Sequence, residues 1–188
     1  MAKLVSKVYG DALFELALEK QSVDTLFEEA ARVREVFEQN SDLMLFLTHP
    51  KISKEEKNTV VKNVFSGRVS EDMTGFLTLI VDKGRADELD AVLGYFLSVV
   101  KEYKKIGVVT VTSARALDDA QRAKLEQKLL ATTDYETLEM HYGVDAALIG
   151  GVVIRIGDRV VDSSIKSKLY SLTRELSKIQ LKVGECAP

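Results

Sequence analysis

One stretch decides the fold of the C-terminal part of this chain: Leu148-Ile149-Gly150-Gly151-Val152-Val153-Ile154-Arg155-Ile156-Gly157-Asp158-Arg159-Val160-Val161-Asp162-Ser163-Ser164-Ile165-Lys166-Ser167-Lys168-Leu169. Side chains alternate in character from Val152 to Gly157, with the period of two that is typical of a strand. Gly157-Asp158 can adopt the positive φ angles of a two-residue hairpin turn. The stretch therefore predicts two strands joined by a tight turn and followed directly by a helix.

The start of that helix carries its own signal. Asp162 or a neighbouring serine offers a side-chain oxygen to the free amide groups of the first helical turn. The apolar positions of the helix are Ile165, Leu169, Leu172 and Leu176. We expect this helix to belong to the same small domain as the hairpin.

Further elements of this domain lie upstream. Residues 108–112 are β-branched and predict a strand, and alternating apolar residues from Leu138 to Tyr142 predict another. Between them, Asp118 and Gln121 have the spacing of a capping box, which predicts a helix to about Ala131. We therefore expect residues 106–188 to form a small α+β domain, in which helices cover one face of a mixed sheet.

Residues 1–105 have the pattern of helices only. Apolar residues at helical spacing predict six helices, over residues 4–20, 23–39, 42–47, 54–65, 71–83 and 87–105. Ser53-Lys54-Glu55-Glu56 is a capping box for the fourth. Short connections between six helices indicate an all-α antiparallel bundle, and this length supports a core of its own.

Composition limits the classes of function. The 188 residues carry a net charge of -3, so the chain has no general attraction to nucleic acid. No run approaches the roughly 20 apolar residues that span a bilayer, and the N-terminus reads as an amphipathic helix and not as a targeting segment. We expect no nucleic-acid partner and no direct membrane insertion. The single cysteine, Cys186, is expected to be a free thiol in the tail.

A search for catalytic, cofactor-binding and metal-binding residues finds none. Gly150-Gly151 has neither Walker spacing nor a place in a Gly-x-Gly-x-x-Gly pattern, so the glycines read as structural. His49 and His141 lie far apart, without clustered metal ligands or an obvious serine partner. We therefore predict a non-catalytic protein without a cofactor.

A helix-binding surface is harder to dismiss. The first helix has an apolar stripe that includes Tyr9, Ala12 and Leu13, and the fifth has one that includes Phe76, Leu77 and Ile80. Such stripes usually face their own bundle. The alternative is a groove between these two helices that accepts an amphipathic helix from a partner.

Several motifs together indicate a family. Tyr9-Gly10-Asp11-Ala12-Leu13-Phe14-Glu15-Leu16-Ala17, His49-Pro50-Lys51-Ile52, Phe76-Leu77-Thr78-Leu79-Ile80-Val81-Asp82-Lys83-Gly84-Arg85 and the stretch quoted first occur in this order. In motif order and spacing the chain resembles the delta subunit of F-type ATP synthases, called the oligomycin-sensitivity-conferring protein (OSCP) in mitochondria. It departs from the family pattern at Gly10, Lys83 and Ala146. At Gly10 the family usually has alanine, and the glycine is expected to cost the helix about 1 kcal/mol.

The resemblance implies a stator subunit that links the catalytic head of the synthase to its peripheral stalk. Its helical domain, residues 1–105, would bind N-terminal helices of the alpha subunits. One of them would lie in the groove between the first and fifth helices. The implied groove residues are Tyr9, Ala12, Leu13, Phe76, Leu77 and Ile80.

The C-terminal domain, residues 106–188, would bind the C-terminal end of the b subunit. The matched signature residues are Gly150, Gly151, Arg155, Asp162 and Ser164, and several of them are expected to make the fold and not the contact. The protein would be a single copy within a hetero-oligomeric complex, peripheral to the cytoplasmic face of an energy-transducing membrane such as a bacterial inner membrane. The alternative is a generic two-domain adaptor or regulatory module that binds amphipathic helices.

Overall fold

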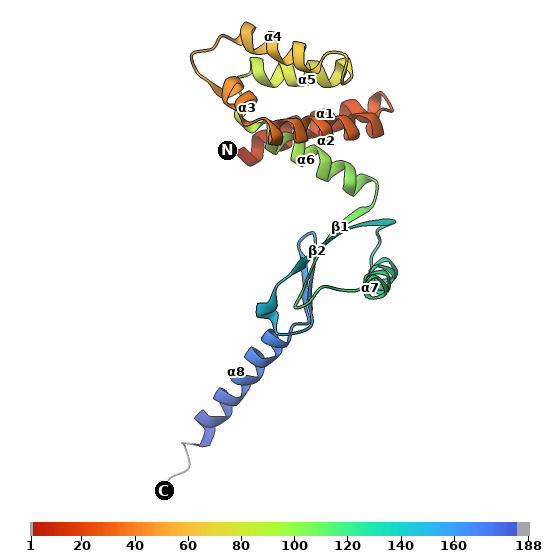
Figure 1. The fold of residues 1–188 in the computed structure, drawn as a ribbon, viewed down its shortest axis with the longest axis vertical. Coiled ribbons are helices and arrows are strands. Elements are labelled where there is room, and N and C mark those ends of the chain that lie inside the picture. The colour runs from red at the N-terminus through yellow and green to blue at the C-terminus, as the bar shows by residue number, and fades with distance from the viewer. Residues whose placement is uncertain (1, 184–188) are drawn as a thin grey trace. The chain divides into compact units, whose positions relative to one another are not determined.

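The computed structural model describes residues 2–183 (Figure 1). The chain divides into two compact units between Tyr103 and Lys104. The first unit is helical and the second contains the sheet. Cys186 lies outside the described residues, so its place on a free tail stays a prediction.

The six predicted helices are present in the first unit. They are α1 (Ala2–Glu19), α2 (Val23–Gln39), α3 (Ser41–Thr48), α4 (Lys54–Phe65), α5 (Glu71–Asp82) and α6 (Leu89–Tyr103), with a 3-10 turn, η1 (Ala86–Glu88), before the last. The capping box of α4 is confirmed, because the Ser53 hydroxyl accepts from the Glu56 N–H and the Glu56 carboxylate accepts from the Ser53 N–H. Helix α6 ends two residues earlier than expected, where Lys105 takes a positive φ of 53°.

All six helices contribute to one apolar core. Each turns its inner stripe towards the others and buries at least one large side chain there. Examples from α1 to α6 in order are Leu13, Leu26, Leu47, Val61, Leu77 and Phe96. Burial of each such side chain stabilises the unit by about 2 kcal/mol before the entropy of ordering is subtracted.

Helices α1 and α6 approach closely because Gly10 has no side chain. A Cβ at Gly10 would overlap the ring of Tyr95. The Tyr95 hydroxyl donates to the Asp11 carboxylate at 2.9 Å, and this hydrogen bond raises the pKa of Tyr95. The local cost of Gly10 to α1 is therefore offset by a contact with a residue far along the chain.

A buried carboxylate joins α2 to the start of α5. Glu29 accepts hydrogen bonds from the N–H of Ser70 at 2.8 Å and from its hydroxyl at 2.6 Å. Ser70 is the N-cap of α5, and its hydroxyl in turn accepts from the N–H of Met73. A negative charge at a helix N-terminus is favourable, because the unpaired amide groups there carry partial positive charge. Glu29 thus fixes where α5 begins.

The second unit is a mixed four-stranded sheet with two helices, which confirms the predicted α+β class. Its elements are β1 (Ile106–Ser113), α7 (Asp119–Thr132), β2 (Thr137–Val144), a 3-10 turn η2 (Ala146–Leu148), β3 (Val152–Ile156), β4 (Arg159–Asp162) and α8 (Ile165–Val183). The strand order is β2-β1-β3-β4, with β1 and β2 parallel and the other pairs antiparallel. The capping box between Asp118 and Gln121 is also confirmed.

One helix covers the apolar face of this sheet. Val109 and Val111 of β1 are buried on that face. Helix α7 lies over its β2 side, where the Arg122 guanidinium stands 4.9 Å from the centre of the Tyr142 ring. The expectation that helices cover the sheet is wrong for α8, whose described apolar side chains, from Ile165 to Leu176, are exposed. In Figure 1 α8 (blue) extends away from the strands of its own unit.

The turn into α8 explains this direction. Gly151 has a φ of +80°, and a Cβ there would overlap the Ser163 carbonyl oxygen. At Gly150 a Cβ would lie 2.6 Å from Cδ1 of Ile165. The Ile165 N–H donates to the Gly150 carbonyl at 3.0 Å. The two glycines therefore let the first turn of α8 cross directly against the start of β3.

Side-chain caps complete the turn. Ser164 is fully buried, and its hydroxyl accepts from the Ser167 N–H at 3.2 Å. Asp162 accepts from the Ser164 N–H at 2.8 Å and from the Ser167 hydroxyl at 2.5 Å. The sequence left open whether Asp162 or a serine caps the helix. Both do, Ser164 as the cap and Asp162 as the group that holds it.

A first prediction concerns Gly10. In Gly10→Ala the added methyl group must displace the Tyr95 ring, so we expect a loss of about 1–3 kcal/mol in the free energy of unfolding. Gly75 is the matched control, since it also lies inside a helix but has no atom within 4 Å of an added Cβ. Gly75→Ala should stabilise by up to about 1 kcal/mol. Urea denaturation followed by circular dichroism measures both, and shifts of the same sign would contradict the packing role of Gly10.

A second prediction concerns Asp162. Hydrogen bonds from Ser167 and Ser164 lower the pKa of its carboxyl group. A carboxyl group whose pKa is lower in the folded state stabilises that state above its unfolded pKa, and the contribution is lost as the pH falls through the folded value. We expect the Ser164 and Ser167 amides to exchange about 5-fold faster in Asp162→Asn at neutral pH. The difference should shrink in acid, as hydrogen exchange at several pH values would reveal. A difference that grows in acid would refute this account.

Candidate partner-binding site

The facing sides of α1 and α5 form the candidate site in the helical unit. The Lys20 ammonium, just beyond α1, contacts the Asp72 carboxylate of α5 at 2.5 Å, which brings the C-terminal end of α1 near the first turn of α5. Ala12 and Leu16 precede Lys20 by eight and four residues and so share its side of α1. Leu79 follows Asp72 by seven residues, close to two helical turns, and so shares its side of α5. We call Tyr9, Ala12, Leu16, Phe76 and Leu79 the α1–α5 face.

The structure separates the six residues predicted for the groove. Leu13, Leu77 and Ile80 are fully buried in the bundle core, so for these three the simple alternative of burial in their own unit holds. They support the α1–α5 face from beneath. Phe76 lies at the edge of the core, Tyr9 is half-buried and Ala12 is exposed.

Leu79 was not among the predicted residues. Its side chain is 46% exposed, whereas the residues on either side of it in the sequence, Thr78 and Ile80, are half-buried and buried. The signal that could have found it is its phase, because it lies on the side of α5 opposite the run of Leu77, Ile80 and Val81. An exposed leucine on α5 and a small exposed alanine, Ala12, on α1 suit the approach of another helix.

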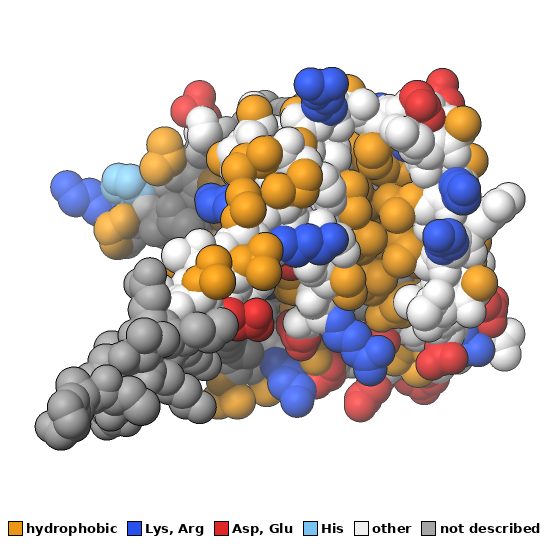
Figure 2. All heavy atoms as spheres, turned by 90° about the horizontal axis from the view of Figure 1, so that it is seen from below, with side chains coloured by type: hydrophobic (Ala, Val, Ile, Leu, Met, Phe, Trp, Pro, Cys, Tyr) orange, Lys and Arg blue, Asp and Glu red, His pale blue; other side chains and the backbone are white. Residues whose placement is uncertain are grey.

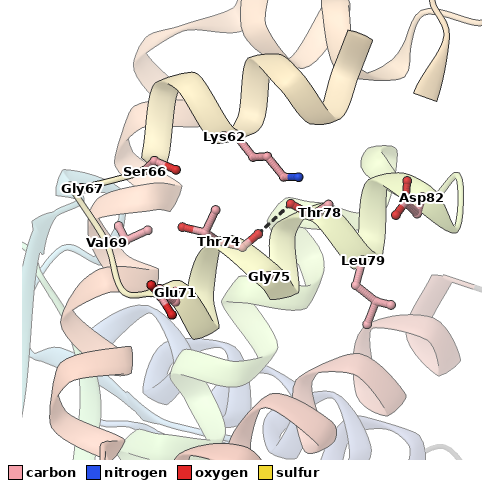
Figure 3. Close-up of a pocket in the computed structure, with 10 residues that line it drawn as sticks. All are labelled: Lys62, Ser66, Gly67, Val69, Glu71, Thr74, Gly75, Thr78, Leu79 and Asp82. Atoms are coloured by element: carbon pink, nitrogen blue, oxygen red, sulfur yellow. Dashed lines mark hydrogen bonds between the residues drawn. The ribbon is translucent and has the colours of Figure 1, made fainter. Parts of the chain in front are cut away.

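A cleft of about 620 Å³ lies on the other side of α5, between it and α4. Figure 3 shows Lys62 reaching from α4 across this cleft, with Thr74, Gly75 and Thr78 of α5 along the opposite wall. Leu79 belongs to the cleft as well as to the α1–α5 face. The side of α5 towards this cleft therefore carries small residues, one leucine and, at its two ends, the carboxylates of Glu71 and Asp82.

The cleft is poorly suited to a phosphate-bearing ligand. Its one lysine, Lys62, is outnumbered by the carboxylates of Glu71 and Asp82, which would repel phosphate oxygens. Within residues 2–183, no group of three or more histidine, cysteine or acidic side chains is placed to hold a metal ion. In the same range no helix combines the length and the apolar character that a bilayer-crossing segment needs.

The signature residues of the C-terminal unit have two different positions. Gly150, Gly151, Asp162 and Ser164 come together at the turn into α8. Arg155 lies apart from them, exposed near the end of β3, between Thr110 of β1 and Val160 of β4. Four of the five therefore shape the turn into α8, and Arg155 is presented to solvent apart from that turn.

Beyond that turn the C-terminal unit exposes apolar side chains. Val160 and Val161 of β4 are exposed, as are Leu169, Leu172 and Leu176 of α8. Figure 2 shows apolar side chains gathered between charged ones on the face that it presents. Such surface in a small unit is typical of contact with another protein.

Comparisons with known proteins agree over nearly the whole chain. The ATP synthase delta (OSCP) subunit family matches residues 5–176. ATP synthase subunit delta of Lachnoclostridium phytofermentans is 57% identical over 181 residues, which cover 96% of this chain and 100% of that protein. ATP synthase subunit delta of Bacillus thuringiensis is 35% identical over 175 residues, covering 93% and 97%.

The fold is also known from a solved structure. A chain in the Toxoplasma gondii mitochondrial ATP synthase hexamer superposes with a TM-score of 0.75, at 20% identity, over 91% of this chain and 96% of that one. At this identity the likeness concerns the fold alone. The sequence relationships identify the family: this chain belongs to the ATP synthase delta (OSCP) subunits, which are non-catalytic subunits of the synthase.

Proposed function

We propose that this protein is the stator connector of an F-type ATP synthase. Its helical unit binds N-terminal helices of the alpha subunits, and its C-terminal unit binds the C-terminal end of the b subunit. It acts as a single copy, peripheral to the cytoplasmic face of the membrane that holds the complex. Family membership supports the complex, and the exposed apolar surfaces of both units support the contacts.

The single observation that carries the alpha-subunit contact is the α1–α5 face. Its inner neighbours Leu13, Leu77 and Ile80 are closed into the core, so the bundle is complete without a partner. Ala12 of α1 and Leu79 of α5 nevertheless leave apolar side chains exposed on the two helices that the ion pair between Lys20 and Asp72 links. A groove of this kind accepts the apolar side of an amphipathic helix.

The chemistry fits a mechanical role. A stator must stay attached while the rotor turns, which requires slow dissociation. Nanomolar binding corresponds to about -12 kcal/mol, and burial of apolar helix faces can supply it without any reacting group. Contacts on two separate units would hold the head and the stalk at the same time.

A third prediction tests the alpha-subunit contact. A peptide with the N-terminal sequence of the alpha subunit from the same organism is titrated calorimetrically into the full-length protein. Leu79→Asp should weaken binding by more than about 10-fold, because a carboxylate would be buried without a partner. Ala12→Asp should do the same from the α1 side.

The matched control is Leu18→Asp. Leu18 is also an exposed leucine near a helix C-terminus, but it lies on the side of α1 away from Lys20. It should leave binding within about 3-fold of the original. Circular dichroism would verify that all three variants fold. If Leu79→Asp and Leu18→Asp bind the peptide equally well, the α1–α5 face is not the site.

A further inference from the structure

The apolar residues of α8 have the spacing of a coiled-coil seam. Ile165, Leu169, Leu172 and Leu176 follow one another in steps of four, three and four, the alternation of the a and d positions of a heptad. In the sequence the same steps continue to Ile179 and Val183. A helix that packs on a sheet needs a broader apolar side, whereas two apolar positions in seven are what a pair of supercoiled helices requires.

Among the side chains that the structure describes, this seam is only partly covered by its own unit. Ile165 is 42% exposed and touches Gly150 at the turn, and the exposed fraction then rises along the helix. It is 50% for Leu169, 54% for Leu172 and 63% for Leu176. The turn at Gly150, Gly151 and Ser164 holds the helix in this direction, so the exposure is built into the fold.

The charge of α8 favours one kind of binding partner for the seam over others. The helix carries five basic residues and one acidic residue, a net charge of +4. They are Lys166, Lys168, Arg174, Lys178 and Lys182 against Glu175. Lys166 and Lys168 flank the first heptad at the positions where partner helices exchange ion pairs. Two copies of α8 would bring like charges together, whereas an acidic helix would be attracted.

We propose that α8 forms a two-helix coiled coil with an acidic amphipathic helix of another protein. The inference deepens the proposed function and rests on it for the name of the partner, the C-terminal end of the b subunit. It adds the surface, which is the seam Ile165, Leu169, Leu172 and Leu176, and the chemistry of the partner. That partner presents an apolar heptad seam flanked by carboxylates beside Lys166 and Lys168.

The test uses the full-length protein and the b subunit of the same organism without its membrane anchor. Leu172→Asp should weaken their binding by more than about 30-fold, because it places a carboxylate in the middle of the seam. Ser171→Asp is the matched control, one residue away and outside the seam, and should change the affinity by less than about 3-fold. Lys166→Glu combined with Lys168→Glu should weaken binding by about 10-fold at low salt and less at high salt.

The outcomes separate the seam from the proposed function. If the b subunit binds the original protein and Leu172→Asp equally well, the seam is overturned while the stator role stands. If it does not bind the original protein, the stator role fails. A synthetic helix with leucine at the seam positions and glutamate beside them then tests α8 alone. Its binding must depend on Leu172, and no binding overturns the seam.

Two further measurements examine the other occupants. Sedimentation equilibrium of the protein alone should give a monomer, and a dimer that Leu172→Asp dissociates would overturn the proposal in favour of a second copy. Vesicles of phosphatidylglycerol should not retain the protein. Retention that is lost in Leu172→Asp would overturn it in favour of a lipid surface.

Discussion

Apolar surface that a chain does not bury must be covered by another molecule or stay in water, at a cost of about 25 cal/mol for each Å². Both units of this protein depend on that constraint. The helical bundle closes its core with Leu13 and Leu77 and still leaves Leu79 exposed. In the C-terminal unit α7 covers the apolar face of the sheet on the β2 side, and α8 keeps its seam in solvent. A protein built in this way is suited to holding other chains together, and it needs no reacting group to do so.

The parts of the fold that sequence could predict are those with local causes. The helix starts at Ser53 and Asp118 depend on a side chain three residues away, and both capping boxes are present as expected. The hairpin between β3 and β4 depends on two adjacent residues. The direction of α8 could not be predicted in the same way. Periodicity indicates that a helix has an apolar side, but it does not indicate which molecule covers that side.

The sequence could indicate which two helices carry the candidate site, but not which of their apolar residues are exposed. On one helix the core stripe and a partner-binding stripe can lie next to each other, so apolar residues such as Ile80 and Leu79 differ in role by one step of 100°. Only the packing of α5 against the other helices separates them. Gly10 is a similar case, because its reason is Tyr95, a residue 85 positions further along the chain. Helix propensity accounts for the destabilising effect of Gly10 on α1, but not for the close packing against Tyr95 that Gly10 allows.

The signature residues lie where the backbone geometry tolerates few residue types. The turn into α8 tolerates few residue types, because Gly151 needs a positive φ and space beside Ser163, and Ser164 must be small, buried and able to accept a hydrogen bond. The seam demands only apolar side chains at the right spacing, which many sequences satisfy. The matched signature residues Gly150, Gly151, Asp162 and Ser164 therefore lie at the turn that directs α8. The contact that we propose for α8 is inferred from exposure and charge, since the seam has no motif of its own.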